Sequence, residues 1–339
     1  MGLHPGSRRP DAGAAQTGSV LLYVVWLVVL LSLFATGIGA RALFSINLVD
    51  RLFEQLRATY ALRAAVVLAG GVIARDATPG VDGFSEEWSD NPAAFSHRSV
   101  ASGTISLLAG RRADGEERFG LEDEDRRVNL NTAPEDVLQR LIESVGGLTP
   151  REAAERSQAI ADWRDPDDRE HPWGAEGSYY RSLRHPYDCK NAPFENVEEL
   201  LLVKGVSPTL YRALEPSVTV YGSGHVNLNT ASEPVLRALG LSEAGVQGLV
   251  AYRAGEDGVE GTSDDHQLPS LTQLDAELGK LVPAEDLARL KKLSAAGILS
   301  TFSTAFRTVI EARADHEWSR MTALCVLDRR GGIRLWAER

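Results

Sequence analysis

The 339-residue chain is long enough for two folded domains beside a membrane anchor, and its composition, 43% hydrophobic and 24% charged, is ordinary for a folded protein. Its formal net charge of -11 opposes binding to nucleic acid and to anionic lipid, but it is compatible with divalent cations. The two cysteines, Cys189 and Cys325, can pair in an oxidising compartment or stay as free thiols, and the sequence leaves both states open.

The N-terminal part predicts a polar leader followed by one long helix. Residues 1–18 are polar, and residues 19–40 are apolar and carry no charge. About 20 apolar residues at ~1.5 Å rise are enough to cross the ~30 Å core of a bilayer. Because apolar residues continue at helical spacing, we expect a helix over 19–75 whose first half spans the membrane, with a strong break at Gly70-Gly71.

This segment resembles the N-terminus of type IV pilins, from which prepilin peptidase removes a leader. The resemblance puts the cleavage between Gly18 and Ser19. Two alternatives stay open: an ordinary secretory signal cut after Ala40, and a plain single-span anchor.

The rest of the chain predicts an α+β fold in which a helical domain interrupts a sheet. Residues 76–127 hold the first part of a pilin-like αβ domain, 128–299 an inserted all-α domain, and 300–339 the strands that complete the sheet. The expected strands lie at 100–108, 301–313, 318–327 and 332–336, with a hairpin turn at 113–115. The long N-terminal helix would pack on this antiparallel sheet.

The predicted helical domain contains an internal repeat. Val128–Leu141 returns as Val226–Leu239, and both copies begin with Val-Asn-Leu-Asn-Thr-Ala. We expect the second Asn and the Thr of each copy to cap the helix that follows, and a proline to lie in its first turn. The apolar stripes would be formed by Val137, Leu138 and Leu141 and by Val235, Leu236 and Leu239. A third helical unit, 197–214, turns at Lys204-Gly205-Val206.

These segments resemble one family closely, the K-type minor pseudopilins of type II secretion. Besides the repeat, the resemblance is carried by Asp162–Asp168, Gly174-Ala175-Glu176, Tyr179-Tyr180, Tyr187, Asn191 and Val197–Gly205. It implies a subunit at the tip of a periplasmic pseudopilus, which joins H-, I- and J-type pseudopilins and helps to export folded proteins across the outer membrane. It also implies cleavage by prepilin peptidase, methylation of the new N-terminus, an inner-membrane anchor, a periplasmic domain and, as an open question, contact with the secreted substrate.

The residue at position 23 fits the tip assignment. Most pilin-like proteins carry Glu at the fifth position after the cleavage site, where the resemblance implies that it neutralises the N-terminal ammonium of a neighbouring subunit. A buried charge of this kind is tolerable only when it is paired. Here the position is Tyr23, so the chain offers no such pairing to a further subunit. Tyr23 taken alone is equally well an ordinary residue of a membrane helix.

Two groups of carboxylates are candidate calcium ligands, because hard oxygen donors on loops suit Ca²⁺. The first group consists of Asp165, Asp167, Asp168 and Glu176, and the second of Glu256, Asp257, Glu260, Asp264 and Asp265. The family resemblance implies calcium in the helical domain. For the first group, turn caps or partners for neighbouring arginines are the alternative, and for the second a solvated acidic loop.

Two other classes of function are weighed against this interpretation. The chain contains no nucleophile–base pair and no metalloprotease, hydrolase or phosphate-loop motif, so we expect no enzyme. The repeat also resembles helix-hairpin-helix modules, which makes a related type IV pilus or DNA-uptake machine the alternative. However, the second turn glycine of such modules is absent, and the acidic charge opposes DNA, so we expect no nucleic-acid partner.

Overall fold

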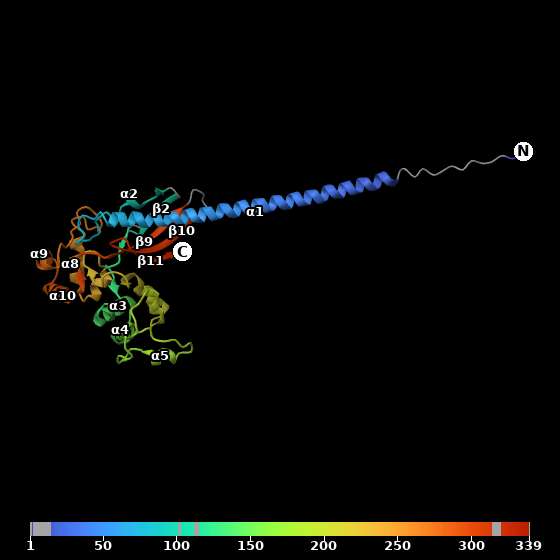
Figure 1. Cartoon of the computed structure of the whole chain (residues 1–339). Helices are drawn as coiled ribbons and strands as arrows, with labels where there is room; N and C mark the ends of the chain where they lie inside the picture. Colours follow the sequence, from blue (N-terminus) through green and yellow to red (C-terminus); the bar gives the residue numbers. More distant parts are fainter. Residues whose placement is uncertain (1, 3–14, 101–102, 112–114, 314–319, 339) are drawn as a thin grey trace. The chain divides into compact units, whose positions relative to one another are not determined.

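The computed structural model describes residue 2 and residues 15–100, 103–111, 115–313 and 320–338, and the side chains of residues 15–19 are outside this description. The chain forms two compact units, Met1–Arg57 and Ala58–Arg339. Helix α1, Ala15–Ile73, is the longest described element (Figure 1). Its apolar part is long enough to cross a membrane, judged by length and composition. The break predicted at Gly70-Gly71 is wrong, because the helix continues through both glycines to Ile73.

The second unit contains an antiparallel sheet whose main strand order is β1-β2-β9-β10-β11, with β3 paired to β2 and β4 to β9. The strands are β1 Arg98–Val100, β2 Gly103–Arg111, β3 Glu117–Phe119, β4 Glu122–Asp123, β9 Ala305–Arg313, β10 Arg320–Asp328 and β11 Ile333–Glu338. Since β2 pairs with β9, the sheet joins segments from both sides of the helical part. Most of the predicted turn at 113–115, and Trp318, lie outside the described residues.

The C-terminal part of α1 packs on this sheet and forms one hydrophobic core with it. Ala61, Leu62, Ala65 and Ala69 of α1 are fully buried against strand residues that include Phe306. Small alanine side chains let a helix approach a sheet closely, and the buried apolar area stabilises the contact. The strand predicted at 301–313 begins at Ala305, and every second side chain from Phe306 to Ala312 is buried, as expected for a strand with one face on a core.

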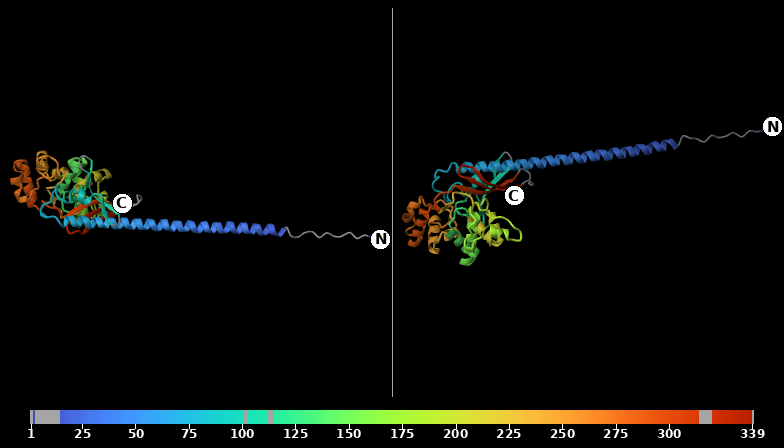
Figure 2. Two further views of the ribbon diagram at one scale, coloured as in Figure 1. Left: turned by 90° about the horizontal axis from the view of Figure 1, so that it is seen from above. Right: turned by 60° about the horizontal axis from the view of Figure 1, so that its bottom comes forward.

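Residues 128–299 form a second hydrophobic core from short helices. The helical elements are α3 Glu135–Gly146, α4 Pro150–Arg164, α5 Gly177–Arg181, η1 Val197–Leu202, α6 Pro208–Leu214, η2 Glu215–Ser217, α7 Glu233–Ala238, α8 Glu243–Arg253, η3 Leu271–Gln273, α9 Leu274–Leu278 and α10 Ala284–Ala295; helix α2, Pro92–Phe95, precedes the sheet. Two short parallel pairs, β5 Val128–Asn129 with β6 Val218–Thr219 and β7 Val226–Asn227 with β8 Leu299–Ser300, complete the elements. Figures 1 and 2 show the strands of the sheet between these helices and the C-terminal part of α1.

The structure corrects one part of the repeat prediction. The apolar stripes of α3 and α7 are buried as predicted. However, the residues at the N-caps of these helices are Pro134 and Ser232, and neither makes a side-chain capping bond. Asn131 instead bonds the backbone of Phe194 in both directions, with N–O distances of 3.0 and 2.7 Å. The amide side chain of asparagine has both a donor and an acceptor. The backbone of Phe194 satisfies both of them, whereas one free N–H at a helix start satisfies only the acceptor.

Candidate metal centre

The first predicted group of carboxylates lies on the loop between α4 and α5. Helix α4 ends at Arg164, and Asp165 follows as its C-cap in an extended conformation. At the other end of the loop, Glu176 precedes α5 as its N-cap residue, but its side chain makes no capping bond. The helix ends therefore bring two carboxylates that are eleven positions apart in sequence to the same place.

Three of the four predicted residues meet at this loop. One oxygen each from Asp165, Asp167 and Glu176 lies within 4.8 Å of the others. Glu176 is only 3% exposed, and neither of its carboxylate oxygens has a hydrogen-bond partner. The Oδ1 atom of Asp165 is also buried without a partner. Buried oxygens without donors are costly, so this arrangement is incomplete without a cation or protons.

The fourth predicted residue, Asp168, does not join this group. Its Oδ1 accepts a hydrogen bond of 2.9 Å from Nδ2 of Asn191, which also donates to the carbonyl of Asp167 at 3.0 Å. The other amide atom, Oδ1 of Asn191, is buried without a partner. Asn191 also adopts a left-handed backbone conformation with φ 46°, which is uncommon outside glycine. Asn191 is therefore a further candidate oxygen ligand, which a search for carboxylates alone does not find.

Burial and mutual repulsion act on the charges of these groups. Burial, followed by the nearby charges of Asp162 and Asp165, raises the pKa of Glu176 to about 7. Burial also raises the pKa of Asp165 above its ordinary value. A divalent cation would reverse both effects by pairing with the ionised carboxylates. Three carboxylate oxygens this close together suit a hard cation such as Ca²⁺, and the buried Oδ1 of Asn191 is a candidate fourth donor.

A buried carboxylate behind the loop fixes its conformation. Asp162 is fully buried and accepts hydrogen bonds from the backbone N–H of Ala175 at 2.7 Å and of His171 at 3.3 Å, and it also bonds the His171 ring. The hydrogen bond to Asp162 raises the pKa of His171. A Cβ atom on Gly174 would lie 1.8 Å from Asp162 Oδ2, so any larger residue would force the carboxylate or the loop to move. In the sequence, Asp162 belongs to the short Asp-Trp-Arg-Asp stretch, but the prediction does not include it among the ligands.

The second predicted group is differently arranged. Glu260 pairs with Arg253 at 2.6 Å, and Asp264 accepts hydrogen bonds from the backbone N–H groups of Glu256 and Asp257 at 2.8 and 3.1 Å. Hydrogen bonds from Thr262 and from these backbone groups lower the pKa of Asp264 to about 2. Asp265 likewise accepts from Gly261 at 2.7 Å. Among the described residues, this loop yields no three carboxylates whose oxygens lie as close together as those of the first group.

The remaining candidate residues lie on other segments of the chain. Gly18 and Ser19 lie within α1, and the exposed Tyr23 follows them on the same helix. Cys189 and Cys325 are free thiols, and Cys325 is buried. The half-buried Cys189 lies beside the centre: its Sγ is 3.8 Å from the carbonyl oxygen of Asp162, and burial together with the nearby charge of Glu176 raises its pKa to about 12.

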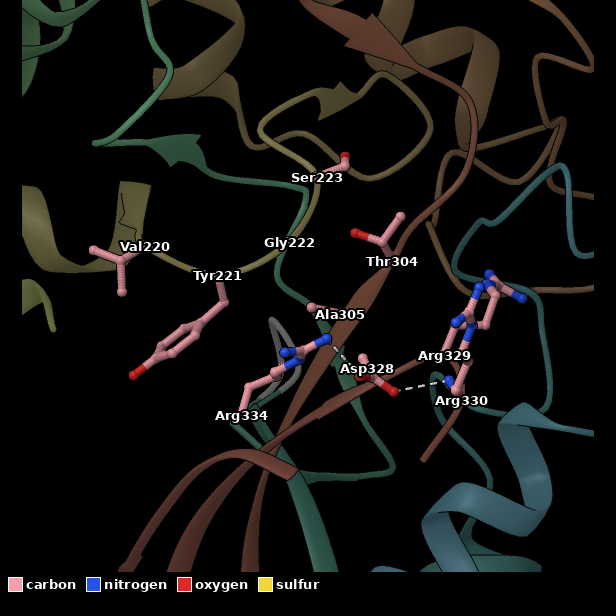
Figure 3. A pocket seen from close by; sticks show the side chains of 10 residues that line it. All are labelled: Val220, Tyr221, Gly222, Ser223, Thr304, Ala305, Asp328, Arg329, Arg330 and Arg334. Carbon is pink, nitrogen blue, oxygen red and sulfur yellow. Dashed lines mark hydrogen bonds and ion pairs between the residues drawn. The ribbon is translucent and has the colours of Figure 1, made fainter. Parts of the chain in front are cut away.

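A cavity of about 580 Å³ lies between the loop Val220–Ser223 and the turn that joins β10 to β11 (Figure 3). Two of its charged side chains are already paired with each other, since Arg334 contacts Asp328 at 2.9 Å. The side chains that line the cavity include no histidine or cysteine that could act as a base or nucleophile beside Ser223.

Comparisons with known proteins agree on one family. A family model described as "Type II secretion system (T2SS), protein K" matches residues 117–223. The chain is 27% identical to type II secretion system protein K of Klebsiella pneumoniae, over 63% of this chain and 66% of that protein. It is 28% identical to the protein of the same name from Pseudomonas aeruginosa, over 78% of this chain and 80% of that one. Among solved structures, this chain is similar to a chain in the crystal structure of the GspK-GspI-GspJ complex from the enterotoxigenic Escherichia coli type 2 secretion system. The two superpose with a TM-score of 0.62 and are 18% identical in sequence, and the match covers 86% of this chain and 97% of that chain.

Proposed function

Because this chain belongs to the protein K family of type II secretion systems, the K-type minor pseudopilins, we propose that it forms the tip of the pseudopilus. In this position it would help to assemble the pseudopilus and thereby support the export of folded proteins across the outer membrane. The observation that carries the proposal is the fold, a long N-terminal helix on an antiparallel sheet with a large helical part between its strands. The related structure of 18% identity, in which a protein of this fold is in complex with GspI and GspJ, supports H-, I- and J-type pseudopilins as partners here.

The anchor and its processing are part of the same proposal. The apolar part of α1 would hold the chain in the inner membrane with Ala58–Arg339 in the periplasm. Prepilin peptidase would remove residues 1–18, and the new N-terminus at Ser19 would be methylated. Mass spectrometry of the N-terminal peptide from membrane-extracted protein tests this step, and a first residue of Arg41 would indicate an ordinary secretory signal instead.

The helical part is proposed to bind calcium through Asp165, Asp167, Glu176 and Asn191. Bound there, the ion would supply charge neutralisation and would link the end of α4 to the start of α5. The proposed role is structural, because the site lies between the end of one helix and the start of the next. We accordingly expect no enzymatic activity.

The structure gives little support to the nucleic-acid alternative. Helix-hairpin-helix turns bind phosphate through free backbone N–H groups at a helix start. In the α3–α4 turn, the carboxylate of Glu152 accepts from the N–H of Thr149 at 3.0 Å. In the α7–α8 turn, the carboxylate of Asp286 accepts from the N–H of Ser242 at 2.9 Å. A carboxylate therefore occupies the position that a phosphate would need at both turns.

The test of the tip proposal is assembly from purified components. The full-length chain in detergent should be monomeric alone and should form a complex containing one copy each of this chain and its I- and J-type partners, as measured by native mass spectrometry. Regular fibres built from this chain alone, or no association among the three proteins, would contradict the proposal.

A further inference from the structure

The two Val-Asn-Leu-Asn-Thr-Ala segments make the same local contacts. Each begins with a two-residue parallel strand pair, β5 with β6 and β7 with β8. In each, the first asparagine accepts a hydrogen bond from the N–H of the second, at 2.9 Å for Asn129 and 3.0 Å for Asn227. Like Asn131 with Phe194, Asn229 bonds the backbone of Leu268 in both directions, at 2.7 and 3.2 Å.

An arginine at the end of the following helix closes each unit. Arg164, the last residue of α4, donates to the carbonyls of Leu130 and Ala133. Arg253, the last residue of α8, donates to those of Leu228 and Ala231, at 3.1 and 2.8 Å. The two units are therefore structural repeats down to single hydrogen bonds, although only part of this is visible in the sequence.

The units differ in what their remaining donors contact. In the first unit, Asn129 Nδ2 donates to the carbonyl of Tyr221 at 2.8 Å, and the exposed Thr132 hydroxyl donates to the carbonyl of Gly224 at 3.1 Å. Both acceptors belong to the helical part. The side chains of Asn129 and Thr132 thus connect the helical part only with itself, whereas Thr219 of the paired strand β6 donates to Glu124 beside the sheet.

In the second unit the equivalent donors reach residues of the sheet and its flanks. Asn227 Nδ2 donates to the carbonyl of Asp82, to Oδ2 of Asp123 and to the hydroxyl of Ser303, at 3.1, 3.1 and 3.0 Å. The Thr230 hydroxyl donates to the same Asp123 carboxylate at 2.5 Å. Asn227, Thr230, Asp123, Asp82 and Ser303 are all fully buried. Asp123 lies in β4, and Ser303 stands two residues before β9.

The carboxylate of Asp123 makes these donors hard to replace. It has no ion pair within the part of the chain that the structure describes, so hydrogen bonds must take the place of its hydration. Two of its donors, Asn227 and Thr230, come from the second repeat. A neighbouring carboxylate, Asp125, adds to the connection, since it accepts from the N–H of Ser223 at 3.1 Å and from the hydroxyl of Thr304 at 2.7 Å, two residues that Figure 3 shows facing the same cavity.

We propose that the second repeat, Val226–Ala231, is the joint that fixes the helical part to the sheet, whereas the first, Val128–Ala133, stabilises the helical part alone. The same sequence element therefore has two roles. The first copy stabilises the helical part internally, and the second copy connects the two hydrophobic cores. Because the connector is buried and hydrogen-bonded, the helical part and the sheet should move as one body.

The repeat supplies its own matched control for a test. Asn227→Ala with Thr230→Val removes the donors of the joint, and Asn129→Ala with Thr132→Val removes the equivalent donors of the first unit. Hydrogen–deuterium exchange of the full-length chain in detergent reads each region separately. We expect the first pair of substitutions to speed exchange at least tenfold at residues 122–125 and 301–304, while α3 and α4 keep their protection. The second pair should speed exchange near 219–224 and leave the joint protected. Thr230→Ser, which keeps the hydroxyl, should behave as wild type.

Every other outcome overturns the proposal. Equal effects of the two pairs on the joint would mean that the repeats have the same role. An unchanged joint in the Asn227→Ala, Thr230→Val chain would mean that its hydrogen bonds do not hold the two cores together. Loss of protection in α3 and α4 of that chain would identify the second repeat as a general folding element.

Discussion

At the scale of single residues, the most informative groups are buried oxygens that have no donor. Both oxygens of Glu176, Oδ1 of Asp165 and Oδ1 of Asn191 are of this kind. Each such group costs about 1–3 kcal/mol when nothing satisfies it, so several of them close together indicate a ligand. Asp165 and Glu176 lie on the same loop, and this is the reason for proposing calcium at the first carboxylate group. In the Glu256–Asp265 loop, by contrast, the carboxylates of Asp257, Glu260, Asp264 and Asp265 have donors or an ion pair.

Calcium should therefore raise the thermal stability of the full-length chain, and EDTA should reverse the effect. A ligand at 100 times its Kd stabilises the native state by about 2.7 kcal/mol. Asp165→Asn with Glu176→Gln should abolish the calcium-dependent rise in Tm, and in EDTA it should melt no lower than wild type because it removes like charges. Asp264→Asn with Asp265→Asn is the control and should keep the rise. A wild-type Tm that ignores calcium would remove the metal proposal.

Gly174 gives a second test at this scale, independent of any ion. Gly174→Ala puts a methyl group against the Asp162 carboxylate, so it should destabilise the chain in EDTA by roughly 1–3 kcal/mol. Gly71→Ala is the control, since no atom lies near its added methyl group and the position is helical, and it should be neutral or slightly stabilising. Thermal melts of both variants decide the matter; equal melting temperatures would mean that the loop yields easily around Asp162.

At the scale of elements, patterns with local causes were predictable and long-range partners were not. Helical spacing and strand alternation depend on neighbouring residues, so the long helix and β9 follow from the sequence. The capping role expected for Asn131 and Thr132 failed because their partners, Phe194 and Gly224, are more than sixty residues away. Asn191 was not predicted as a candidate metal ligand for the same reason, since only the folded chain puts its amide beside Asp167 and Asp168.

The segment that follows α1 carries a pH-dependent prediction. Oxygens of Asp76, Asp82 and Glu86 lie within 4.8 Å of one another, and Arg329 pairs with the first two. Burial, then the charge of Asp82, raises the pKa of Glu86 to about 8, and burial raises that of Asp82 to about 6. The folded state therefore favours the protonated acids, so their stabilisation is complete below about pH 4 and is lost as the pH rises through 6 and 8.

In EDTA, the Tm of the chain should consequently fall between pH 5 and pH 8. Glu86→Gln, which imitates the protonated acid, should reduce this fall, whereas the exposed neighbour Glu87→Gln should leave it unchanged. If Glu86→Gln lowered the Tm equally at both pH values, the glutamate would be acting as an ionised hydrogen-bond acceptor and the prediction would be wrong.

At the scale of the whole molecule, the chain combines a membrane-length helix with two hydrophobic cores, which we propose are joined through the buried polar residues of the second repeat. The sequence contained the signals for the helix and for both cores, but the joint depends on burial of Asp123 by residues about a hundred positions later. A tip subunit needs an anchor that enters the fibre and a body that stops further addition. The bulk of residues 128–299 suits the second requirement, and the side chain at position 23 bears on the first.

Tyr23→Glu separates a tip position from a position inside the fibre. At a tip, no further subunit supplies an ammonium group to the new carboxylate, so the charge in the hydrocarbon would cost roughly 2.5–3.5 kcal/mol. We expect Tyr23→Glu to lower pseudopilus number and secretion in cells that lack the wild-type chain, and Tyr23→Phe, which keeps the ring without a charge, to restore both. Immunoblots for the membrane-bound chain must show equal amounts of the two variants. Assembly by Tyr23→Glu at or above the wild-type level would mean that a neighbouring ammonium group pairs with position 23, and it would place this subunit within the fibre instead of at its end.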